Sequence, residues 1–313
     1  MSNRPDEHGI VAIDVDYVRP GLAASHLIIE DGRAAFVDTG TTHSVPALLQ
    51  AVADAGLAPS DVEYVFLTHI HLDHAGGAGE LMATLPKATC IVHPRGARHL
   101  ADPSRLIEGS IAVYGEAAFN QLYGEIVPID ATRIVSTNDG HRLSLGDRAF
   151  EFFHTEGHAR HHHCIADSRS GGIFTGDSFG LSYRELDSER GPFLFPTSTP
   201  VHFDPDAAHA SVDAIAGRQP RMLYLTHYSA IDFEDRFVTE MHSSLDAYVA
   251  LTGEHGDAAD AVERLTAALL AYLDERMIAH GVTLTATERA AVVQMDCALN
   301  AQGLVHWWHQ KAH

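Results

Sequence analysis

The chain has 313 residues, of which 45% are hydrophobic, and its 21 basic and 42 acidic residues leave a formal net charge of -21. This length and composition are typical of one large or two modest globular domains and exclude a disordered chain. A charge of -21 without a basic patch repels phosphate backbones and anionic lipid, so we expect neither nucleic-acid nor membrane partners.

The start of the chain and its cysteines bear on the compartment. Residues 1–9 are polar and contain no apolar signal-peptide core, and no apolar run approaches the roughly 20 residues that cross a bilayer. We therefore expect a cytoplasmic protein. Cys90, Cys164 and Cys297 are odd in number and widely spaced, which indicates neither a disulfide framework nor a cysteine zinc site. We expect them to be small core residues.

Strand patterns dominate the first part of the chain. An Asp31-Gly32 turn between two β-rich runs favours a hairpin with positive φ in the turn, and Gly56 is a plausible C-cap for the helix before it. The elements that we expect here are a strand over 9–18, hairpin strands over 24–29 and 34–37, a helix over 45–55 and a buried strand over 62–67.

The densest chemical signal follows that buried strand directly. Residues 69–74 read His-Ile-His-Leu-Asp-His, and two glycines follow shortly after. Neutral imidazole is the commonest metal ligand in proteins, and aspartate is a hard oxygen donor. The run His69-x-His71-x-Asp73-His74 therefore offers two pairs of ligands to two adjacent cations. The alternative is a histidine-rich surface loop, in which histidines rarely show this spacing between a strand and two glycines.

Layered α/β patterns continue after this run. Residues 96–124 read as one or two helices and are predicted to form an insertion over the site. The remaining elements are a helix over 79–85, a strand over 88–92, strands over 133–136 and 142–145 joined through the Asn138-Asp139-Gly140 turn, a strand over 149–154, and a hairpin over 165–167 and 172–175.

Other strand ends also carry residues of ligand type. Asp38 at the end of a buried strand requires hydrogen bonds or a nearby cation, and an Asx turn with Gly40 is the alternative. Because ligand sites in layered α/β folds are built from such ends, we expect these residues to meet. The residues are Asp38, His158 in a Gly-His turn, Asp177 after the second hairpin, and His227 at the end of a strand over 222–227.

From residue 232 onward the periodicity becomes helical. Apolar residues recur every three or four positions in three helices, with breaks at 253–257 and 280–283. We therefore divide the chain into a catalytic domain over 1–231 and a helical C-terminal subdomain over 232–313. We expect the stretch from His306 to His309 to lie in a terminal helix that packs onto the body, and an aromatic interface patch is the alternative.

The ordered set of these residues resembles the metallo-β-lactamase superfamily across roughly residues 9–230. The resemblance implies an αββα sandwich, with the helical C-terminal extension added, and a dinuclear centre. It assigns His69, His71 and His158 to one metal, Asp73, His74 and His227 to the other, and Asp177 to both as a bridge. His162, four residues past His158, is predicted to support a ligand, as is Asp38.

Within the superfamily the pattern is similar to the glyoxalase II, lactonase and phosphodiesterase-like group. Zinc β-lactamases generally lack an aspartate at the bridging position, so Asp177 argues against antibiotic hydrolysis. Diiron oxygen-reducing relatives commonly carry glutamate where His71 stands, which counts against redox chemistry. An iron-dependent redox enzyme with persulfide or oxygen chemistry and, behind it, a phosphodiesterase or nuclease remain the alternatives.

The expected activity is hydrolysis of a small ester, thioester or lactone. Two divalent ions, zinc first and iron or manganese as alternatives, lower the pKa of a shared water and polarise an acyl oxygen. Asp73 is expected to orient the nucleophile and take its proton, and Tyr183 and Tyr228 are candidate oxyanion donors or leaving-group acids, with packing under a loop as their alternative. The sequence leaves open the substrate and a homodimer through the apolar C-terminal helices.

Overall fold

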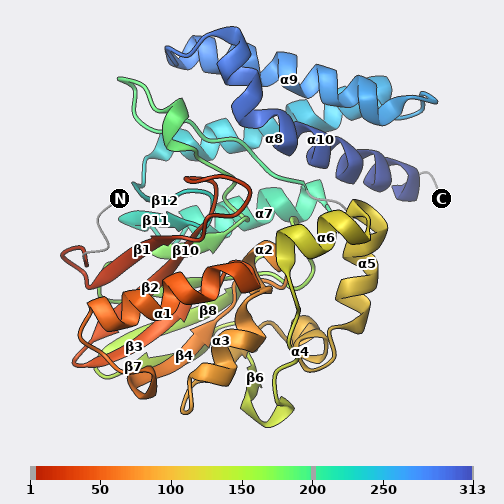
Figure 1. Cartoon of the computed structure of the whole chain (residues 1–313). Coiled ribbons are helices and arrows are strands. Elements are labelled where there is room, and N and C mark those ends of the chain that lie inside the picture. Colours follow the sequence, from red (N-terminus) through yellow and green to blue (C-terminus); the bar gives the residue numbers. More distant parts are fainter. Residues whose placement is uncertain (1–4, 199–201, 312–313) are drawn as a thin grey trace. The chain divides into compact units, whose positions relative to one another are not determined.

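The computed structural model describes residues 5–198 and 202–311 (Figure 1). It divides into two compact units. The strand unit comprises Met1–His154, His161–Gly176 and Arg221–Ala230, and the helical unit comprises Thr155–Arg160, Asp177–Pro220 and Ile231–His313. The domain boundary predicted after residue 231 lies beside the last crossing between the units, and as a division into two domains it stays a prediction.

Two six-stranded sheets organise the fold. The first has the order β1-β2-β3-β4-β5-β6 and the second β12-β11-β10-β9-β8-β7. The first sheet consists of β1 (Ile10–Asp14), β2 (Ala24–Glu30), β3 (Arg33–Val37), β4 (Val62–Phe66), β5 (Thr89–Val92) and β6 (Ile134–Ser136). The second consists of β7 (His141–Leu145), β8 (Arg148–His154), β9 (His163–Asp167), β10 (Ile173–Gly176), β11 (Met222–Leu225) and β12 (Ser229–Asp232).

The two sheets face each other across an aromatic core. The ring of Phe66 in the first sheet lies 5.2 Å from the rings of Phe150 and Phe152 in the second, in edge-to-face contacts. All three side chains are fully buried. Burial of each contributes about 1.5–3 kcal/mol, and edge-to-face geometry adds to it. This packing fixes the face-to-face arrangement of the sheets in the strand unit.

The β2–β3 hairpin and the parallel strands bring several chain segments to one sheet edge. Asp31 and Gly32 have φ of 48° and 73°, as the predicted turn requires. Strands β3, β4 and β5 run parallel, so the residues that follow β3 and β4 leave the sheet at the same edge. Asp38 follows β3 and the histidine run follows β4 at that edge.

The Asn138-Asp139-Gly140 turn joins the strands over 133–136 and 142–145, as expected. The two strands belong to different sheets, because β6 pairs with β5 in the first sheet and β7 with β8 in the second. The turn carries the chain between sheets and is tied to β8, since Gly140 N donates to Phe152 O. A local turn signal says nothing about the sheet in which the next strand finds its partner.

Helices flank the strands as predicted, and residues 96–124 form an inserted helical segment. That segment consists of the end of α4 and of α5 and α6, where one or two helices were expected. The helices of the strand unit are α1 (Val45–Asp54), α2 (Leu72–Ala75), α3 (Ala78–Thr84), α4 (Pro94–Ala101), α5 (Ser104–Tyr114) and α6 (Glu116–Tyr123). Short 3-10 turns occur at Thr42–Ser44, Pro59–Asp61, Ala131–Arg133 and Arg184–Leu186.

The helical unit contains α7 (Pro205–Ala216), α8 (Asp235–His255), α9 (Ala261–His280) and α10 (Ala286–Lys311). The last three confirm the helical periodicity of the C-terminal part. Within the unit, Trp308 of α10 packs beside Gly256, and its Nε1 donates to Asp257. The aromatic end of the chain therefore belongs to a helix that packs within this unit, and its packing onto the body stays a prediction.

Two further sequence expectations can be compared with the structure. All three cysteines are buried and carry free thiols, as predicted. In the described part of the chain, no helix combines the length and apolar character that a membrane crossing requires. The arrangement of two facing sheets flanked by helices, with helices at the C-terminus, confirms the predicted α/β class and αββα architecture.

Candidate metal centre

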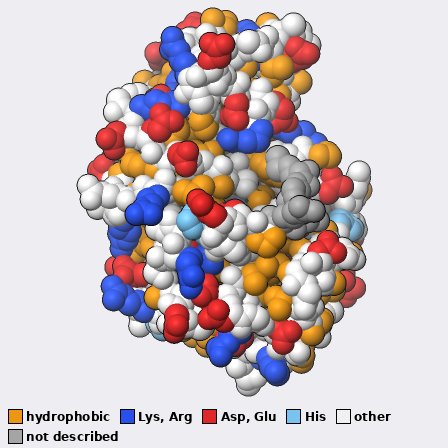
Figure 2. Space-filling model, turned by 90° about the vertical axis from the view of Figure 1, so that its left-hand side faces the viewer, with side chains coloured by type: hydrophobic (Ala, Val, Ile, Leu, Met, Phe, Trp, Pro, Cys, Tyr) orange, Lys and Arg blue, Asp and Glu red, His pale blue; other side chains and the backbone are white. Residues whose placement is uncertain are grey.

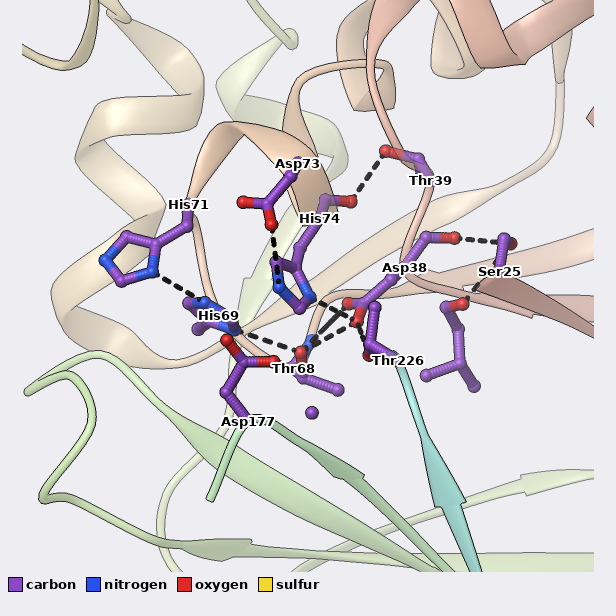
Figure 3. A network of polar contacts seen from close by, with 12 residues as sticks. Ser25, Asp38, Thr39, Thr68, His69, His71, Asp73, His74, Asp177 and Thr226 are labelled. Carbon is purple, nitrogen blue, oxygen red and sulfur yellow. Dashed lines mark hydrogen bonds and ion pairs between the residues drawn. The ribbon is translucent and has the colours of Figure 1, made fainter. Parts of the chain in front are cut away.

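The histidine run occupies the connection between β4 and α2. His71 is the N-cap of α2, and its carbonyl accepts from the backbone N–H groups of His74 and Ala75. This short helix places Asp73 in its first turn and His74 behind it. His69 comes before the helix and is fully buried. The backbone of this connection brings the side chains of the run together as two pairs of candidate metal ligands (Figure 3).

A buried carboxylate holds one end of this cluster. Asp38 Oδ2 accepts from His74 Nδ1 at 2.9 Å, from Thr68 Oγ1 at 2.9 Å and from Thr226 Oγ1 at 2.9 Å, and its Oδ1 accepts from the Thr68 N–H at 2.8 Å. These side chains point toward one another in Figure 3. The bonds replace the Asx-turn alternative for Asp38. Because Nδ1 keeps its proton and donates it to the carboxylate, Nε2 is the candidate ligand atom of His74.

The backbone of Asp38 is itself unusual. Its φ of 57° lies in the left-handed region, which costs an aspartate of order 1 kcal/mol. Its neighbour Thr39 is held as well, since the Thr39 N–H and hydroxyl both donate to His74 O, at 2.7 and 2.9 Å. The surrounding hydrogen bonds therefore stabilise a strained turn that aims the carboxylate at His74.

His227 is oriented in the same manner from the second sheet. It follows β11, its Nδ1 donates to Leu22 O at 2.8 Å, and its Nε2 lies 3.4 Å from Asp73 Oδ2. His74 Nε2 lies 3.5 Å from the same oxygen. The ligand atoms of Asp73, His74 and His227 all lie within 4.8 Å of one another. Two imidazoles and one carboxylate form a three-ligand set of the kind that binds zinc with an open position.

The other half of the run forms a second pair. His69 Nε2 and His71 Nδ1 lie 2.8 Å apart, and Thr68 Oγ1 contacts the other nitrogen of His69 at 3.2 Å. The rings of His69 and His74 have centroids 4.0 Å apart, so the two pairs are adjacent. A centre of two cations at these adjacent pairs stays a prediction.

His158 and Asp177 belong to the helical unit and lie next to each other there. His158 Nε2 is 3.4 Å from Asp177 Oδ2, and both side chains are buried. The turn before His158 requires glycine, because Gly157 has φ of 121° and a Cβ would meet the backbone nitrogen of Ala208 at 2.4 Å. Asp177 is bonded to Gly176, the last residue of β10 in the strand unit.

Gly176 and His162 lie beside the histidine run. A Cβ on Gly176 would meet His162 Nε2 at 2.5 Å and Thr68 Oγ1 at 2.7 Å, so the end of β10 approaches the end of β4 closely. The fully buried His162 ring stacks on His69 with centroids 4.9 Å apart. His162 thus contacts a candidate ligand, and its supporting role stays a prediction.

Neither predicted catalytic tyrosine is exposed. Tyr228, next to His227, and Tyr183 are both fully buried. Tyr183 donates its hydroxyl proton to Asp296 Oδ1 of α10 at 3.0 Å within the helical unit. That bond places the Tyr183 phenol in a packed contact, and packing was the alternative to a catalytic role. Catalytic roles for the two tyrosines stay predictions.

Two groups of residues near the candidate site were not predicted from the sequence. Thr68 and Thr226 each precede a candidate ligand histidine and donate to Asp38, and the repeated Thr-His pair at two strand ends was a signal for them. Tyr17, Tyr114 and Tyr123 form a cluster in which the Tyr17 and Tyr123 hydroxyls lie 3.0 Å apart. Burial, together with the charge of Asp73, raises the pKa of Tyr114 and of Tyr123. These phenols therefore stay protonated as donors near Asp73.

Comparison with known families agrees with this geometry. A family model described as the metallo-beta-lactamase superfamily matches residues 18–227, which include every candidate ligand. A metallo-beta-lactamase fold-containing protein of Sulfurisphaera tokodaii, ST1585, is 26% identical over 198 residues, covering 62% of this chain and 67% of that protein. A hydroxyacylglutathione hydrolase of Xanthomonas euvesicatoria is 32% identical over 170 residues, covering 54% of this chain and 51% of the enzyme.

The similar solved structures share the fold at lower identity. The metallo-beta-lactamase family protein TTHA1429 from Thermus thermophilus superposes with a TM-score of 0.68 at 19% identity, over 97% of this chain and 94% of that one. The crystal structure of ST1585 gives 0.66 at 20% identity, over 96% and 99%. The match to the hydroxyacylglutathione hydrolase, in contrast, spans about half of that enzyme's length.

Proposed function

Because this chain belongs to the metallo-beta-lactamase superfamily, a superfamily of metal-dependent hydrolases, we propose that it hydrolyses a small ester, thioester or lactone at a centre of two divalent ions. The observation that carries the proposal is the group formed by Asp73, His74 and His227. Both imidazoles donate from Nδ1 to fixed oxygen atoms, which prepares Nε2 as the ligand atom.

The proposed ligand set follows the two pairs of the histidine run. The ligands beyond this group are assigned from the resemblance of the sequence to the superfamily. We assign His69, His71 and His158 to one ion, Asp73, His74 and His227 to the other, and Asp177 to both. The imidazole and carboxylate set fits zinc, and it also suits iron and manganese.

Two divalent ions held there would lower the pKa of a bound water toward neutrality and polarise an acyl oxygen. The protein's own part in the reaction falls first to Asp73. Its side chain is 21% exposed and reaches both His74 and His227, so it can orient a nucleophilic water and accept its proton. Tyr123 and Tyr114, kept protonated by burial, are candidate donors to the substrate.

Thioesters are the first substrates to test. Hydroxyacylglutathione hydrolases, whose name describes a thioester substrate, are among the relatives at 32% identity. On the face shown in Figure 2, basic side chains are scattered among acidic ones and do not form one stripe, which gives the phosphodiesterase alternative no support. The net charge of -21 points the same way.

The test joins elemental analysis with a substrate panel. Protein purified without added chelator is expected to contain two equivalents of metal and to hydrolyse thioesters or lactones faster than phosphodiesters. Removal of the metal should abolish turnover, and re-addition should restore it. Turnover that survives complete removal would contradict the proposal. Bound iron with a visible absorption spectrum and no acyl hydrolysis would favour the redox alternative.

A further inference from the structure

A small crevice in the helical unit lies beside His158 and Asp177, which are two of the proposed metal ligands. Its free volume is about 10 Å³, the space of a single water-sized group. Its apolar side is formed by Met241 and Leu245, one turn apart on α8, and by Ala208 of α7. Met241 and Leu245 are each 2% exposed. A substrate that reaches His158 and Asp177 therefore meets a narrow space with an apolar side.

Contacts within the helical unit fix the backbone around this crevice. The end of the Met241 side chain packs against Gly180, where a Cβ would meet Met241 Cε at 2.9 Å. Pro196, which also lines the crevice, belongs to a segment that is held by the buried Asn300 of α10. Asn300 Nδ2 donates to Pro196 O at 3.3 Å, and Asn300 Oδ1 accepts from the Ser198 N–H at 2.7 Å. Because the backbone is held, the side chains on α8 set the width of the crevice.

The charges around the crevice do not suit an anionic group. No lysine or arginine is among the described residues that line it, and Glu156 is the charged residue there besides the proposed ligands. A substrate carboxylate placed in the crevice would face Glu156 without a basic side chain to pair with, and an unpaired charge in a confined site is costly. An aliphatic group meets the apolar side chains without this cost. The lining therefore favours an uncharged group.

We propose that the crevice receives the acyl end of the substrate and limits it to uncharged aliphatic groups of about two to four carbons. Met241 and Leu245 are then the residues that determine acyl specificity. Both lie outside residues 18–227, the part of the chain that matches the family model, so membership of the superfamily does not fix this preference. Turnover of the acyl group rests on the proposed function. The size limit of the crevice does not.

The first experiment measures kcat/KM of the metal-loaded protein on N-acetylcysteamine thioesters that differ only in the acyl chain. In the wild type, kcat/KM should fall at least about 10-fold from butyryl to octanoyl, because a closed pocket rejects methylenes that it cannot hold. Met241→Ala and Leu245→Ala widen the crevice and should reduce this ratio by about 10-fold. Each ratio is taken within one preparation, so a loss of folded protein does not change it.

The matched control is Met277→Ala. Met277 is a fully buried methionine of α9 and does not line the crevice, so this variant should keep the wild-type ratio. A change in Met277→Ala as large as that in Met241→Ala would overturn the proposal. So would a wild type that turns over octanoyl and butyryl thioesters equally well.

A second pair of substrates tests the charge. Succinyl and butyryl thioesters have the same number of acyl carbons and differ in a terminal carboxylate. The wild type should prefer the butyryl thioester by at least about 10-fold, because the carboxylate would approach Glu156. Equal values of kcat/KM, or a preference for the succinyl thioester, would overturn the assignment of an uncharged acyl group.

Binding of hydroxamates separates the crevice from the proposed reaction. A hydroxamate binds metal ions through its oxygen atoms and carries its alkyl chain in the position of an acyl chain. Calorimetric titration of the loaded wild type should show tighter binding of butyrohydroxamate than of octanohydroxamate, and Met241→Ala should reverse this order. This result together with absent turnover would refute the hydrolase and support the size limit. The same order in the wild type and in Met241→Ala would overturn the size limit.

Discussion

The metal centre and a second group of histidines offer a direct comparison, because both lie at strand ends of the strand unit. His93, His154 and His163 pack together, with ring centroids of His93 and His154 4.1 Å apart and those of His93 and His163 6.2 Å apart. Their ring nitrogens bond to Thr137 and to the backbone of Arg95. In the metal centre the corresponding partners are Asp38 and Asp73.

The difference shows what separates a candidate ligand from a packed histidine. Burial without a carboxylate lowers the pKa of His163 to about 3 and that of His93 to about 4, so both rings stay neutral. His163 Nε2 has no hydrogen-bond partner among the described residues. Histidine density alone, with 23 in the chain, therefore does not identify the site. The carboxylates of Asp38 and Asp73 beside His74 and His227 do.

The largest effect is expected from the carboxylate between His74 and His227. Asp73→Asn keeps the shape of the side chain and removes its charge and basicity, so turnover on thioesters or lactones should fall by about 10²- to 10⁴-fold. Metal content and circular dichroism of the same preparation show whether the metal, the proton acceptor or the fold was lost. Glu80→Gln on α3 is the matched control. Full turnover in Asp73→Asn would sink the proposed mechanism.

The next effect concerns the residue that supports His74. Asp38→Asn leaves an acceptor for His74 Nδ1 and removes the negative charge, so metal affinity should fall by about 10- to 100-fold. Competition with a chromophoric chelator measures it. Asp31→Asn is a matched control, because Asp31 is also an aspartate with positive φ, and it lies in an exposed turn. Equal affinities in the two variants would show that Asp38 has only a structural role.

The histidine cluster predicts a pH dependence with a definite sign. The pKa of His163 is about 3 in the folded protein, and the pKa of an ordinary histidine side chain is 6.5, so the unfolded chain binds the proton more tightly. The neutral His163 ring makes its full contribution to the free energy of unfolding above pH 6.5. This contribution is lost progressively as the pH falls toward 3. Between pH 7.5 and 5 the loss is about 2 kcal/mol, at 1.36 kcal/mol per pH unit below 6.5.

Urea unfolding of His163→Leu tests this dependence. The variant should lose about 2 kcal/mol less than the wild type between pH 7.5 and 5, while its metal content stays at the wild-type level. If the variant and the wild type lose the same free energy of unfolding between pH 7.5 and 5, His163 is not the cause of the acid sensitivity. A drop in metal content would mean that the packed histidine cluster and the metal centre are coupled. The two groups of histidines would then not be independent of each other.

The sequence predicted the parts of the site that are local. The run from His69 to His74 is contiguous, and the strand ends at Asp38 and His227 are visible as polar residues after apolar runs. The partners of Asp38 were not predictable, because Thr226 lies 188 residues away and meets it only once both sheets have formed. The alternative Asx turn with Gly40 stayed open for the same reason.

Packing between elements decides what the local sequence leaves open. The pairing of β6 and β7 with different sheets depends on the core around Phe66 and Phe152, which a turn motif does not encode. On α7 and α8, His209 and Asp213, and likewise His242 and Asp246, are four residues apart within one helix. In the structure each histidine contacts the aspartate of the neighbouring helix.

The smallest effect is expected at Thr226, and it measures how far the support of the metal centre extends. Thr226→Val keeps the volume of the side chain and removes one of the hydrogen bonds that Asp38 Oδ2 accepts. The oxygen still accepts from Thr68 and His74. A lost bond to a charged group costs about 1.5–3 kcal/mol, and the remaining donors should hold the loss near the lower end. Urea unfolding gives this value, and chelator competition should show a smaller loss of metal affinity than Asp38→Asn.

The control variant Thr137→Val removes the equivalent hydroxyl from His163. It should lower stability without changing metal affinity, and a loss of affinity in that variant as large as in Thr226→Val would show that the hydroxyl bonds to Asp38 contribute nothing specific to the metal centre.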